Sequence, residues 1–350
     1  MSLEHQATSY RMTNNGSTTS ANLLACVFLV GDTTDAWYRG GYFSLAGYTD
    51  LDRFLNEDGV VAGRTLAAMN VPVARRIRQI ELNMERWRWL PRDLGATHAR
   101  VNIPEYRLDI WEADRIALTM RVVVGAIDNK TPIFADQMTH IVFSPYWNVP
   151  PSIASEETLP AVQSDPGYLD RNNLEVVGTS GGVLDPSMVD WSNPNSYRFR
   201  QKPGTSNSLG LVKFMFPNQH NVYLHDTPAD ALFARPVRAL SHGCVRVEQP
   251  TTLARYLLRD RREWDEDRID AAMHAGRESH VKLSKPIPVY LLYMTARASH
   301  ADGAVHFRDD IYGYDAQQGR AFDERVRSLQ LRSALMLDAL SPTAGVAGSR

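Results

Sequence analysis

The feature that most limits how this chain can fold is a change of hydrophobic periodicity close to Ala99. From "ARVNIPEYRLDIWEADRIALTMRVVVG" (99–125) onward, apolar and polar residues tend to alternate, and Met120–Val124 is rich in β-branched side chains. A period of two is typical of strands, and β-branched residues favour them. A β-rich domain therefore begins here. The turn residues Asp128–Lys130 predict a hairpin between the strands on either side.

Helical spacing precedes this boundary. Residues 51–55 and 63–69 predict two short amphipathic helices, which cannot form a stable unit alone. Apolar residues then recur at helical spacing from Val73 to Met84, and Pro91 ends the run. We interpret this third segment as a connecting helix.

The pattern breaks between Ser144 and Gly204, where Pro, Asn, Ser and Gly replace periodic runs. This stretch is too long for a plain loop, so we expect an insertion over a site. Strands return in "LGLVKFMFPNQHNVYLH" (209–225), with "PNQHN" as the turn between them. After Asp315 the sequence predicts one more helix.

Charge and composition exclude some classes of protein. The formal net charge is -2 over 350 residues, so there is no overall basic field for nucleic acid or an anionic membrane. The apolar run Leu23–Val30 is much shorter than the ~18 residues that a membrane span needs. Its flanks lack the features of a signal peptide. Residues 1–22, rich in Ser, Thr and Asn, predict a disordered leader.

The stretch "LSHGCVRVEQP" sets Cys244 beside a histidine, and the only other cysteine is Cys26. If residues 242–246 are extended, His242, Cys244 and Arg246 share one face. A free thiol has a pKa of about 8.5, so it needs an adjacent imidazole to become a good nucleophile at neutral pH.

Two further features fit an acyl-transfer site. His225 ends the strand "VYLH" and would reach the same point as the cysteine. Gly243 leaves its backbone amide unobstructed, so consecutive N–H groups would face a developing oxyanion. The pattern alone leaves two alternatives open. His225, His242 and Cys244 would give three metal ligands, although no fourth is evident. Cys244 would otherwise be an inert core thiol, as we expect for Cys26.

The segment "HDTPADALFARPVRALSHGCVR" (225–246) resembles the active-site signature of the L,D-transpeptidases with a YkuD-type catalytic domain. That signature is a histidine, a spacer, then Ser or Thr, His, Gly, Cys, an apolar residue and Asn or Arg. The resemblance extends over about residues 20–315 through "NMERWRWLP", "VNIPEY", "MRVVVG", "PYWNVPPSIASEE", "QKPGTSNSLGLVKFMFPN" and "HFRDDIYGYD". The pattern is similar to the large Gram-negative periplasmic subgroup.

The resemblance implies an α+β, mainly β fold: a YkuD-like β-sandwich with an inserted capping subdomain, preceded by a small helical domain. The expected parts are a disordered leader 1–22, a degenerate peptidoglycan-binding-like domain 23–72, a connecting helix 73–97, a catalytic domain 98–315 with a capping insertion 145–203, and a C-terminal helix and tail 316–350.

The resemblance also implies roles for individual residues. Cys244 would be the nucleophile and His225 its general base, with Tyr223 beside it. His242 and Gly243 would shape the thiolate environment and the oxyanion hole, and Ser241 would hold the loop. Arg246 stands where some relatives have Asn, and would either bind a substrate carboxylate through its guanidinium fork or form a structural ion pair.

The implied reaction is transpeptidation of peptidoglycan in the periplasm. Cys244 would take the acyl group of a tetrapeptide stem, release D-alanine and pass the acyl group to a meso-diaminopimelate amine, forming 3-3 cross-links that serve cell-wall biogenesis and cell shape. No cofactor, metal or nucleotide is implied, and carbapenems are expected to acylate Cys244. The partners would be stem peptides. The N-terminal segment would bind glycan or act as a scaffold.

Other readings remain open. An L,D-carboxypeptidase, or an enzyme that attaches or detaches a protein partner, would use the same residues. A catalytically silent cell-wall binding protein is the alternative from another class.

Overall fold

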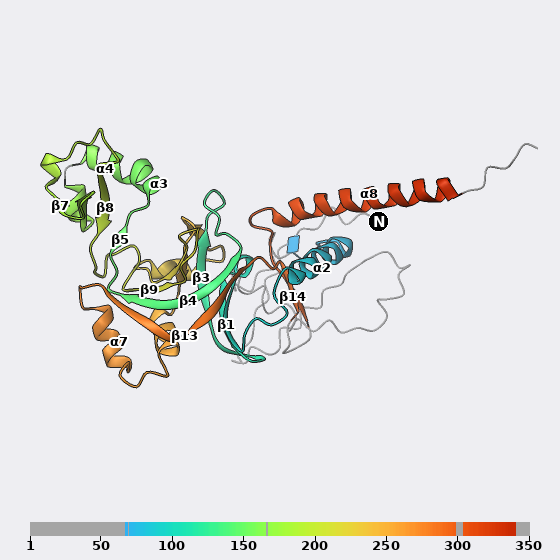
Figure 1. Ribbon diagram of the computed structural model, residues 1–350, viewed down its shortest axis with the longest axis horizontal. Helices are drawn as coiled ribbons and strands as arrows, with labels where there is room; N and C mark the ends of the chain where they lie inside the picture. Colours follow the sequence, from blue (N-terminus) through green and yellow to red (C-terminus); the bar gives the residue numbers. More distant parts are fainter. Residues whose placement is uncertain (1–66, 69, 166, 299–303, 341–350) are drawn as a thin grey trace, which may run out of the picture. The chain divides into compact units, whose positions relative to one another are not determined.

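The computed structural model describes residues 67–68, 70–165, 167–298 and 304–340. The expected leader 1–22 and nearly all of the expected helical domain 23–72 therefore lie outside the described residues. The chain divides into two compact units (Figure 1). One is Pro91–Tyr293, and the other combines Met1–Leu90 with Met294–Arg350.

The unit Pro91–Tyr293 is built on one nine-stranded sheet, so the expected mainly β, α+β class is confirmed. Its strand order is β11-β3-β12-β10-β9-β4-β13-β1-β2. The strands are β1 (Thr97–Asn102), β2 (Arg107–Glu112), β3 (Arg115–Gly125), β4 (Phe134–Phe143), β9 (Val212–Met215), β10 (Leu224–His225), β11 (Ala239–Ser241), β12 (Val245–Val247) and β13 (Ser279–Leu292).

Strand β3 closes the sheet on itself. Its first part pairs with β2, from Glu112↔Arg115 to Arg107↔Arg121, and its second part pairs with β12 through Arg246↔Val123. The β-branched run 122–124 is fully buried here, as its composition predicts. Because β2 and β12 both pair with β3, these strands leave no long open edge.

The hairpin predicted at Asp128–Lys130 is wrong. This segment joins β3 to β4, but β4 pairs with β9 and β13 instead. The Gly125 N–H donates to Thr131 Oγ1 at 2.8 Å, and a Cβ on Gly125 would overlap the Asn129 carbonyl. The chain therefore turns back tightly on itself and carries β4 away from β3.

The stretch expected to be an insertion is an ordered subdomain with a small sheet of its own (Figure 1). The sheet has the order β5-β8-β6-β7. Its elements are β5 (Trp147–Asn148), α3 (Pro151–Ile153), η5 (Ala154–Thr158), α4 (Leu159–Ser164), α5 (Tyr168–Arg171), β6 (Leu174–Gly178), β7 (Val183–Leu184), η6 (Pro186–Met188) and β8 (Tyr197–Gln201).

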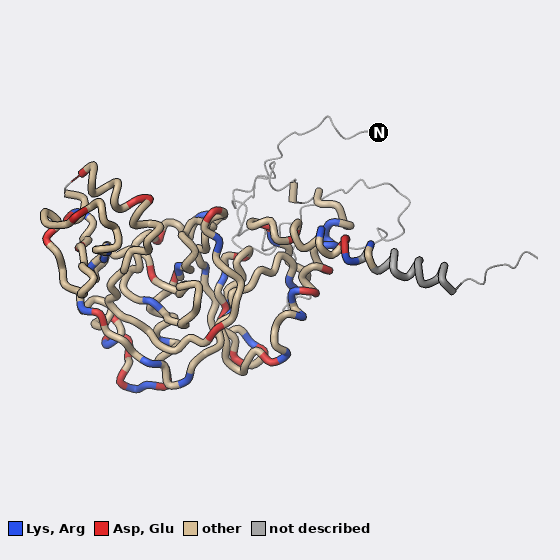
Figure 2. Tube along the Cα trace, turned by 45° about the horizontal axis from the view of Figure 1, so that its top comes forward, with Lys and Arg blue, Asp and Glu red and all other residues tan. Residues whose placement is uncertain are grey.

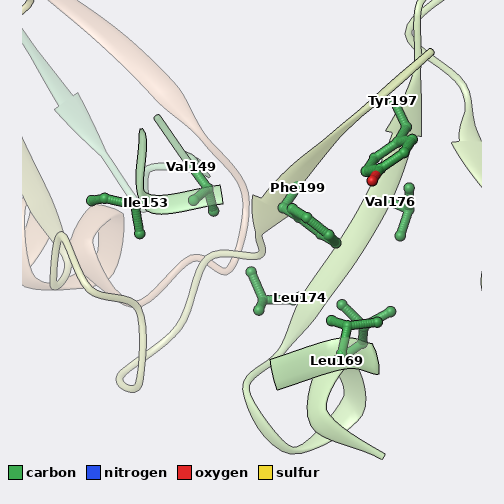
Figure 3. Close-up of a cluster of buried hydrophobic side chains, with 8 residues drawn as sticks. Val149, Ile153, Leu169, Leu174, Val176, Tyr197 and Phe199 are labelled. Atoms are coloured by element: carbon green, nitrogen blue, oxygen red, sulfur yellow. The ribbon is translucent and has the colours of Figure 1, made fainter. Parts of the chain in front are cut away.

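A separate hydrophobic core holds this insertion together (Figure 3). Leu174 and Val176 of β6 and Tyr197 and Phe199 of β8 are buried with Leu169 of α5. Each buried aliphatic or aromatic side chain of this kind contributes about 1.5–3 kcal/mol to folding. No periodic pattern in the sequence predicts this core, because its strands are short and turn residues separate them widely.

Short elements complete this unit. Helix α6 (Pro250–Leu257) leads to α7 (Glu266–Met273), whose first turn is capped by the Asp265 side chain accepting from the Arg268 N–H at 2.9 Å. Two 3₁₀ turns, η4 (Ile103–Glu105) and η7 (Asp230–Ala234), lie between strands.

The second unit contains the helix predicted from Val73 and the helix predicted after Asp315. These are α2 (Val73–Arg88) and α8 (Tyr314–Leu340), and α2 contacts both α8 and β14 (Ala296–Ala298). Strand β14 pairs with β15 (Val305–Phe307). A mostly buried ion pair joins the two helices, with Arg86 Nη1 2.7 Å from Asp315 Oδ1.

One loop of the β unit depends on a glycine. Gly210 has a φ of 61°, and a Cβ there would overlap the Asp226 carboxyl group. That carboxyl accepts from the N–H groups of Leu211 and Thr227, both at 2.7 Å. The loop before β9 is thereby tied to the end of β10.

Gly210→Ala should lower the free energy of unfolding by about 2–5 kcal/mol, measured by urea denaturation. A positive φ costs a residue with a Cβ about 1–2 kcal/mol, and the overlap with Asp226 adds about 1–3 kcal/mol. Gly276→Ala is the matched control, because Gly276 has a φ of 62° and open space around it. Equal losses in the two variants would contradict the role given to Asp226.

Candidate active site

Two very short parallel strands form the base of the site. Leu224 of β10 pairs with Val245 of β12, and His225 pairs with Arg246. Leu224 and Val245 are completely buried in the core. Successive residues of a strand point to opposite faces, so His225 and Arg246 lie together on the other face.

Tyr223 and Cys244 extend this pairing by one residue. The Val245 N–H donates to the Tyr223 carbonyl at 3.2 Å, so Tyr223 lies beside Cys244. The Tyr223 side chain hydrogen-bonds Cys244 and meets the His225 ring edge-on, and the charge of Arg246 acts on Cys244, so the four side chains lie close together. The structure thus brings together four of the seven predicted site residues.

The turn before the cysteine is held by two hydroxyl groups. Ser241 Oγ donates to the Cys244 carbonyl at 2.5 Å and accepts from the Gly243 N–H at 3.1 Å. Thr131 Oγ1 donates to the Gly243 carbonyl at 2.8 Å. The hydrogen bonds of Ser241 are those expected of a residue that holds the loop, whereas the contact of Thr131 was not predicted from the sequence.

The backbone at Gly243 differs in two ways from what the sequence predicts. Its φ is 116°, so the extended run assumed for residues 242–246 holds only from Val245 onward. Its N–H donates to Ser241, so it is not free to face an oxyanion as expected. The Cys244 N–H, by contrast, has no acceptor within the described part of the chain.

His242 is exposed, and its imidazole contacts the insertion. Its Nε2 is 2.8 Å from Glu157 Oε1, a residue of η5 in the insertion. The motif therefore contacts the insertion, a link that no sequence pattern indicated.

The sulfur of Cys244 is enclosed by polar groups. It lies 3.8 Å from the Asn221 carbonyl, which can accept the thiol proton, and hydrogen-bonds the Tyr223 side chain. Part of the residue remains exposed, yet burial raises its thiol pKa. Hydrogen bonds from Tyr223 and the charge of Arg246 act in the opposite direction. The resting group is therefore a thiol whose ionised form has partners ready.

Asn221 owes its position to the preceding turn. The Asn218 amide donates to the carbonyls of Phe216 and Val222, and its oxygen accepts from the His220 and Val222 N–H groups. Asn221 itself has a φ of 53°, which Asn tolerates better than most residues. The "PNQHN" turn therefore does more than join two strands: it aims a carbonyl at the sulfur.

His225 is only 4% exposed. Its Nδ1 lies 2.5 Å from the Asp226 carbonyl, which assigns the proton to Nδ1 and leaves Nε2 as the basic nitrogen. Burial, followed by the charge of Arg246, lowers the pKa of His225 to about 3. The ring meets Tyr223 edge-on, with centroids 5.7 Å apart. At neutral pH it is an uncharged base.

Arg246 forms no ion pair with a carboxylate among the described residues. Its Nε is buried and has no hydrogen-bond partner among the described residues. Burial lowers the pKa of Arg246, and the charge of Cys244 raises it. A buried guanidinium is stabilised by a bidentate anion, and the two alternatives predicted for Arg246 differ on this point. No carboxylate of the described residues pairs with it, which favours a substrate group.

Among the described residues, no group of three or more His, Cys, Asp or Glu side chains is placed to hold a metal ion. No described helix combines the length and the apolar character needed to cross a membrane.

Comparisons with known proteins agree with the motif. The family model described as the YkuD L,D-transpeptidase catalytic domain matches residues 96–270. A Haemophilus influenzae protein, named as a candidate L,D-transpeptidase, is 36% identical over 243 residues, which make up 69% of this chain and 48% of that protein. The chain thus spans about half the length of this curated relative.

Solved structures are more distant. An L,D-transpeptidase from Mycobacterium smegmatis is 12% identical with a TM-score of 0.26, over 56% of this chain and 58% of that one. L,D-transpeptidase 1 from Mycobacterium tuberculosis is 12% identical with a TM-score of 0.23, over 56% of this chain and 61% of that one. At these TM-scores neither adds to what the strands and the site establish.

The buried His225 should make stability depend on pH. Below its ordinary pKa of 6.5 the unfolded chain binds a proton that the folded protein rejects until about pH 3. Between pH 6.5 and 4.5 the free energy of unfolding should fall by on the order of 2 kcal/mol from this group, with no slope above pH 6.5. Urea denaturation of His225→Gln should lack that part of the slope.

His274→Gln is the control, because His274 is an exposed histidine at the end of α7. It should keep the slope of the wild-type protein. Identical slopes in wild type and His225→Gln would show that the imidazole is not held neutral.

Proposed function

Because the chain belongs to the L,D-transpeptidase family, whose catalytic-domain model covers half of it, we propose that it is a peptidoglycan transpeptidase acting through Cys244. The donor is a tetrapeptide stem, and the acceptor is a meso-diaminopimelate amine on a second stem. The observation that carries the proposal is the register of β10 and β12, which sets His225 beside Arg246, whose charge acts on both His225 and Cys244. We further propose the periplasm as the location, because the substrate lies there.

Acylation begins with proton transfer. His225 Nε2 takes the thiol proton as Cys244 Sγ attacks the carbonyl carbon of the third stem residue. The negative charge formed on sulfur passes to the carbonyl oxygen of the tetrahedral intermediate. We assign two donors to that oxygen: the Cys244 N–H, which has no acceptor among the described residues, and the Tyr223 hydroxyl, which hydrogen-bonds Cys244.

Collapse of the intermediate breaks the bond to D-alanine. The imidazolium of His225 returns its proton to the departing amine, so D-alanine leaves neutral at nitrogen and a thioester remains on Cys244. The acceptor amine then attacks the thioester, and His225 takes a proton from it. The sulfur leaves as thiolate, with Arg246 as its nearest cation, and takes the proton from the His225 imidazolium, which restores the resting thiol and imidazole.

We assign Arg246 to a substrate carboxylate, and its unpartnered, buried Nε supports this role. His242 is assigned to the environment of the motif through its contact with Glu157. A strained β-lactam carbonyl, such as that of a carbapenem, would be attacked by Cys244 in the same way and would leave a stable thioester. No step needs a metal or a cofactor.

We also propose that the insertion 145–203 is a lid that limits water at the acyl-enzyme. The contact between Glu157 and His242 supports this, since it joins the insertion to the residue next but one to the nucleophile. The contacting segment η5 is a π-helical turn, a type of distortion often found at functional sites. Excluding water favours transfer to an amine over hydrolysis.

The reaction is tested by incubating a purified disaccharide-tetrapeptide with the protein and with Cys244→Ala, and measuring product masses. A cross-linked dimer with released D-alanine, absent with Cys244→Ala, is the expected result. Tripeptide alone would make water the acceptor and the protein an L,D-carboxypeptidase. Untouched substrate would favour a cell-wall binding protein instead.

The lid is tested by the ratio of tripeptide to dimer in the same assay. Glu157→Gln should raise this ratio roughly two- to fivefold, the range expected for weakening one exposed side-chain hydrogen bond. Glu156→Gln removes the same charge from the neighbouring exposed position and should leave the ratio unchanged. A Glu157→Gln ratio equal to that of the control would sink the lid proposal.

A further inference from the structure

The turn between β3 and β4 packs against the backbone of the cysteine motif. Ser241 of β11 pairs with Gly125 at the end of β3. A Cβ on Gly243 would meet the Asn129 carbonyl at 3.8 Å, an ordinary van der Waals distance. The turn 126–131 therefore lies directly beside the residues that lead into the nucleophile.

Thr131 is the residue of this turn whose side chain reaches the motif. It is completely buried. Its Oγ1 accepts from the Gly125 N–H and donates to the Gly243 carbonyl, both at 2.8 Å. Because an N–H can only donate and a carbonyl can only accept, these two partners fix the direction of the hydroxyl proton. The end of β3 thus holds the hydroxyl in one orientation.

The Gly243 carbonyl belongs to the same peptide group as the Cys244 N–H. This peptide group is planar and trans, so its C=O and its N–H point in opposite directions. The hydrogen bond from Thr131 to the oxygen therefore also fixes the direction of the N–H. That N–H has no acceptor among the described residues, and it is one of the two donors assigned to the oxyanion.

The peptide group before Cys244 needs such an anchor because a glycine precedes it. Gly243 has a φ of 116°, and without a Cβ it allows the peptide group to rotate at little steric cost. The peptide group after the nucleophile is already held, because the Cys244 carbonyl accepts from Ser241 Oγ. Thr131 supplies the corresponding hold on the peptide group before it.

Polarisation acts in the same direction as orientation. The Gly125 N–H, the Thr131 hydroxyl and the Gly243 carbonyl form a chain of hydrogen bonds. Each bond in such a chain polarises the next one. Electron density drawn toward the Gly243 oxygen makes the Cys244 N–H a stronger donor. Thr131 thus affects both the direction and the strength of this donor.

Local donors matter because the protein has no overall basic field. The net charge is -2, and acidic and basic positions are interspersed along the described chain (Figure 2). Arg246 is a cation whose charge acts on Cys244, and the proposed function assigns it to a substrate carboxylate. Stabilisation of the oxyanion therefore depends on how the nearby N–H and hydroxyl dipoles are aimed.

We propose that Thr131 is a positioning residue, which aims the Cys244 N–H at the oxyanion by holding the Gly243 carbonyl. This inference rests on the proposed function for the acyl-transfer step. Because Thr131 is completely buried, it acts through the peptide group and not by touching the substrate.

Two reactions of Cys244 separate the aim of its N–H from the general state of its thiol. Acetyl transfer from p-nitrophenyl acetate forms a thioester, releases p-nitrophenolate and passes through a tetrahedral oxyanion. Alkylation by iodoacetamide displaces iodide and forms no oxyanion. Mass spectrometry of the peptide that contains Cys244 gives both rates on the full-length protein, and their ratio is the quantity to compare.

Thr131→Val replaces the hydroxyl by a methyl group of similar size. Acylation should slow about 10- to 100-fold, less than the full loss of an oxyanion donor, because the N–H remains but is no longer held. Alkylation should stay within about twofold, and Thr131→Ser, which keeps the hydroxyl, should keep the ratio within about threefold of wild type. If Thr131→Val does not fold, Thr131→Ala and Thr131→Ser form a second pair that differs only in the hydroxyl, and the same contrast is expected.

Thr295→Val is the matched control. Thr295 is also completely buried, and its hydroxyl donates to Asp315 Oδ2 at 2.7 Å and accepts from Asn83 Nδ2 at 2.8 Å, in the other unit of the chain. This variant should leave both rates within about twofold. Equal losses of acylation and alkylation in Thr131→Val would indicate a general disturbance of the site and overturn the proposal. An unchanged ratio in that variant would overturn it as well.

The disaccharide-tetrapeptide separates this inference from the proposed function. The predicted ratios, together with no dimer and no D-alanine from wild-type protein, would reject the transpeptidase and keep the role of Thr131. Dimer formation by wild-type protein, together with an unchanged ratio in Thr131→Val, would keep the transpeptidase and reject that role.

Discussion

The pairing of two short strands, β10 and β12, is the constraint on which the rest of the site depends. One face of the pair buries Leu224 and Val245 completely, and hydrophobic burial fixes the register because a slip of one residue would turn those side chains outward. The same register sets His225 and Arg246 side by side on the other face. Strand β3 holds β12 from the opposite edge and also closes the sheet through β2. The packing of Leu224 and Val245 on one face of the pair thus fixes which side chains meet on the other face.

Burial has a second consequence: it disfavours the thiolate form of Cys244 and the imidazolium form of His225. It raises the pKa of the Cys244 thiol and lowers that of the His225 imidazole. Arg246 and Tyr223 counteract this for the sulfur and supply partners for negative charge. The thiol and the imidazole are therefore both uncharged at rest, and in the proposed reaction charge develops only as Cys244 attacks.

Local sequence patterns were enough to predict the fold class and several residues that the structure brings together in the candidate site. The mainly β class predicted from alternation is confirmed. Cys244, His225 and Tyr223, predicted from one motif and one strand ending, lie close together, while their chemical roles stay predictions. Local pattern failed where backbone geometry intervened: a φ of 116° at Gly243 interrupts the extended run expected over residues 242–246, and the turn at 128–130 joins strands that do not pair. Glu157 and Thr131 could not be found at all, because their positions depend on contacts between segments far apart in the chain. Contacts of that kind are decided by the packed core, not by neighbouring residues.

The pH dependence of Cys244 alkylation tests the central claim, a neutral thiol–imidazole pair, most directly. Iodoacetamide modification of the peptide that contains Cys244 would be followed by mass spectrometry from pH 5 to pH 10. Because burial raises the thiol pKa, the rate should be low at pH 7 and should still be rising at pH 9. A rate that reaches its plateau below pH 7 would reveal a thiolate–imidazolium ion pair at rest and contradict the account.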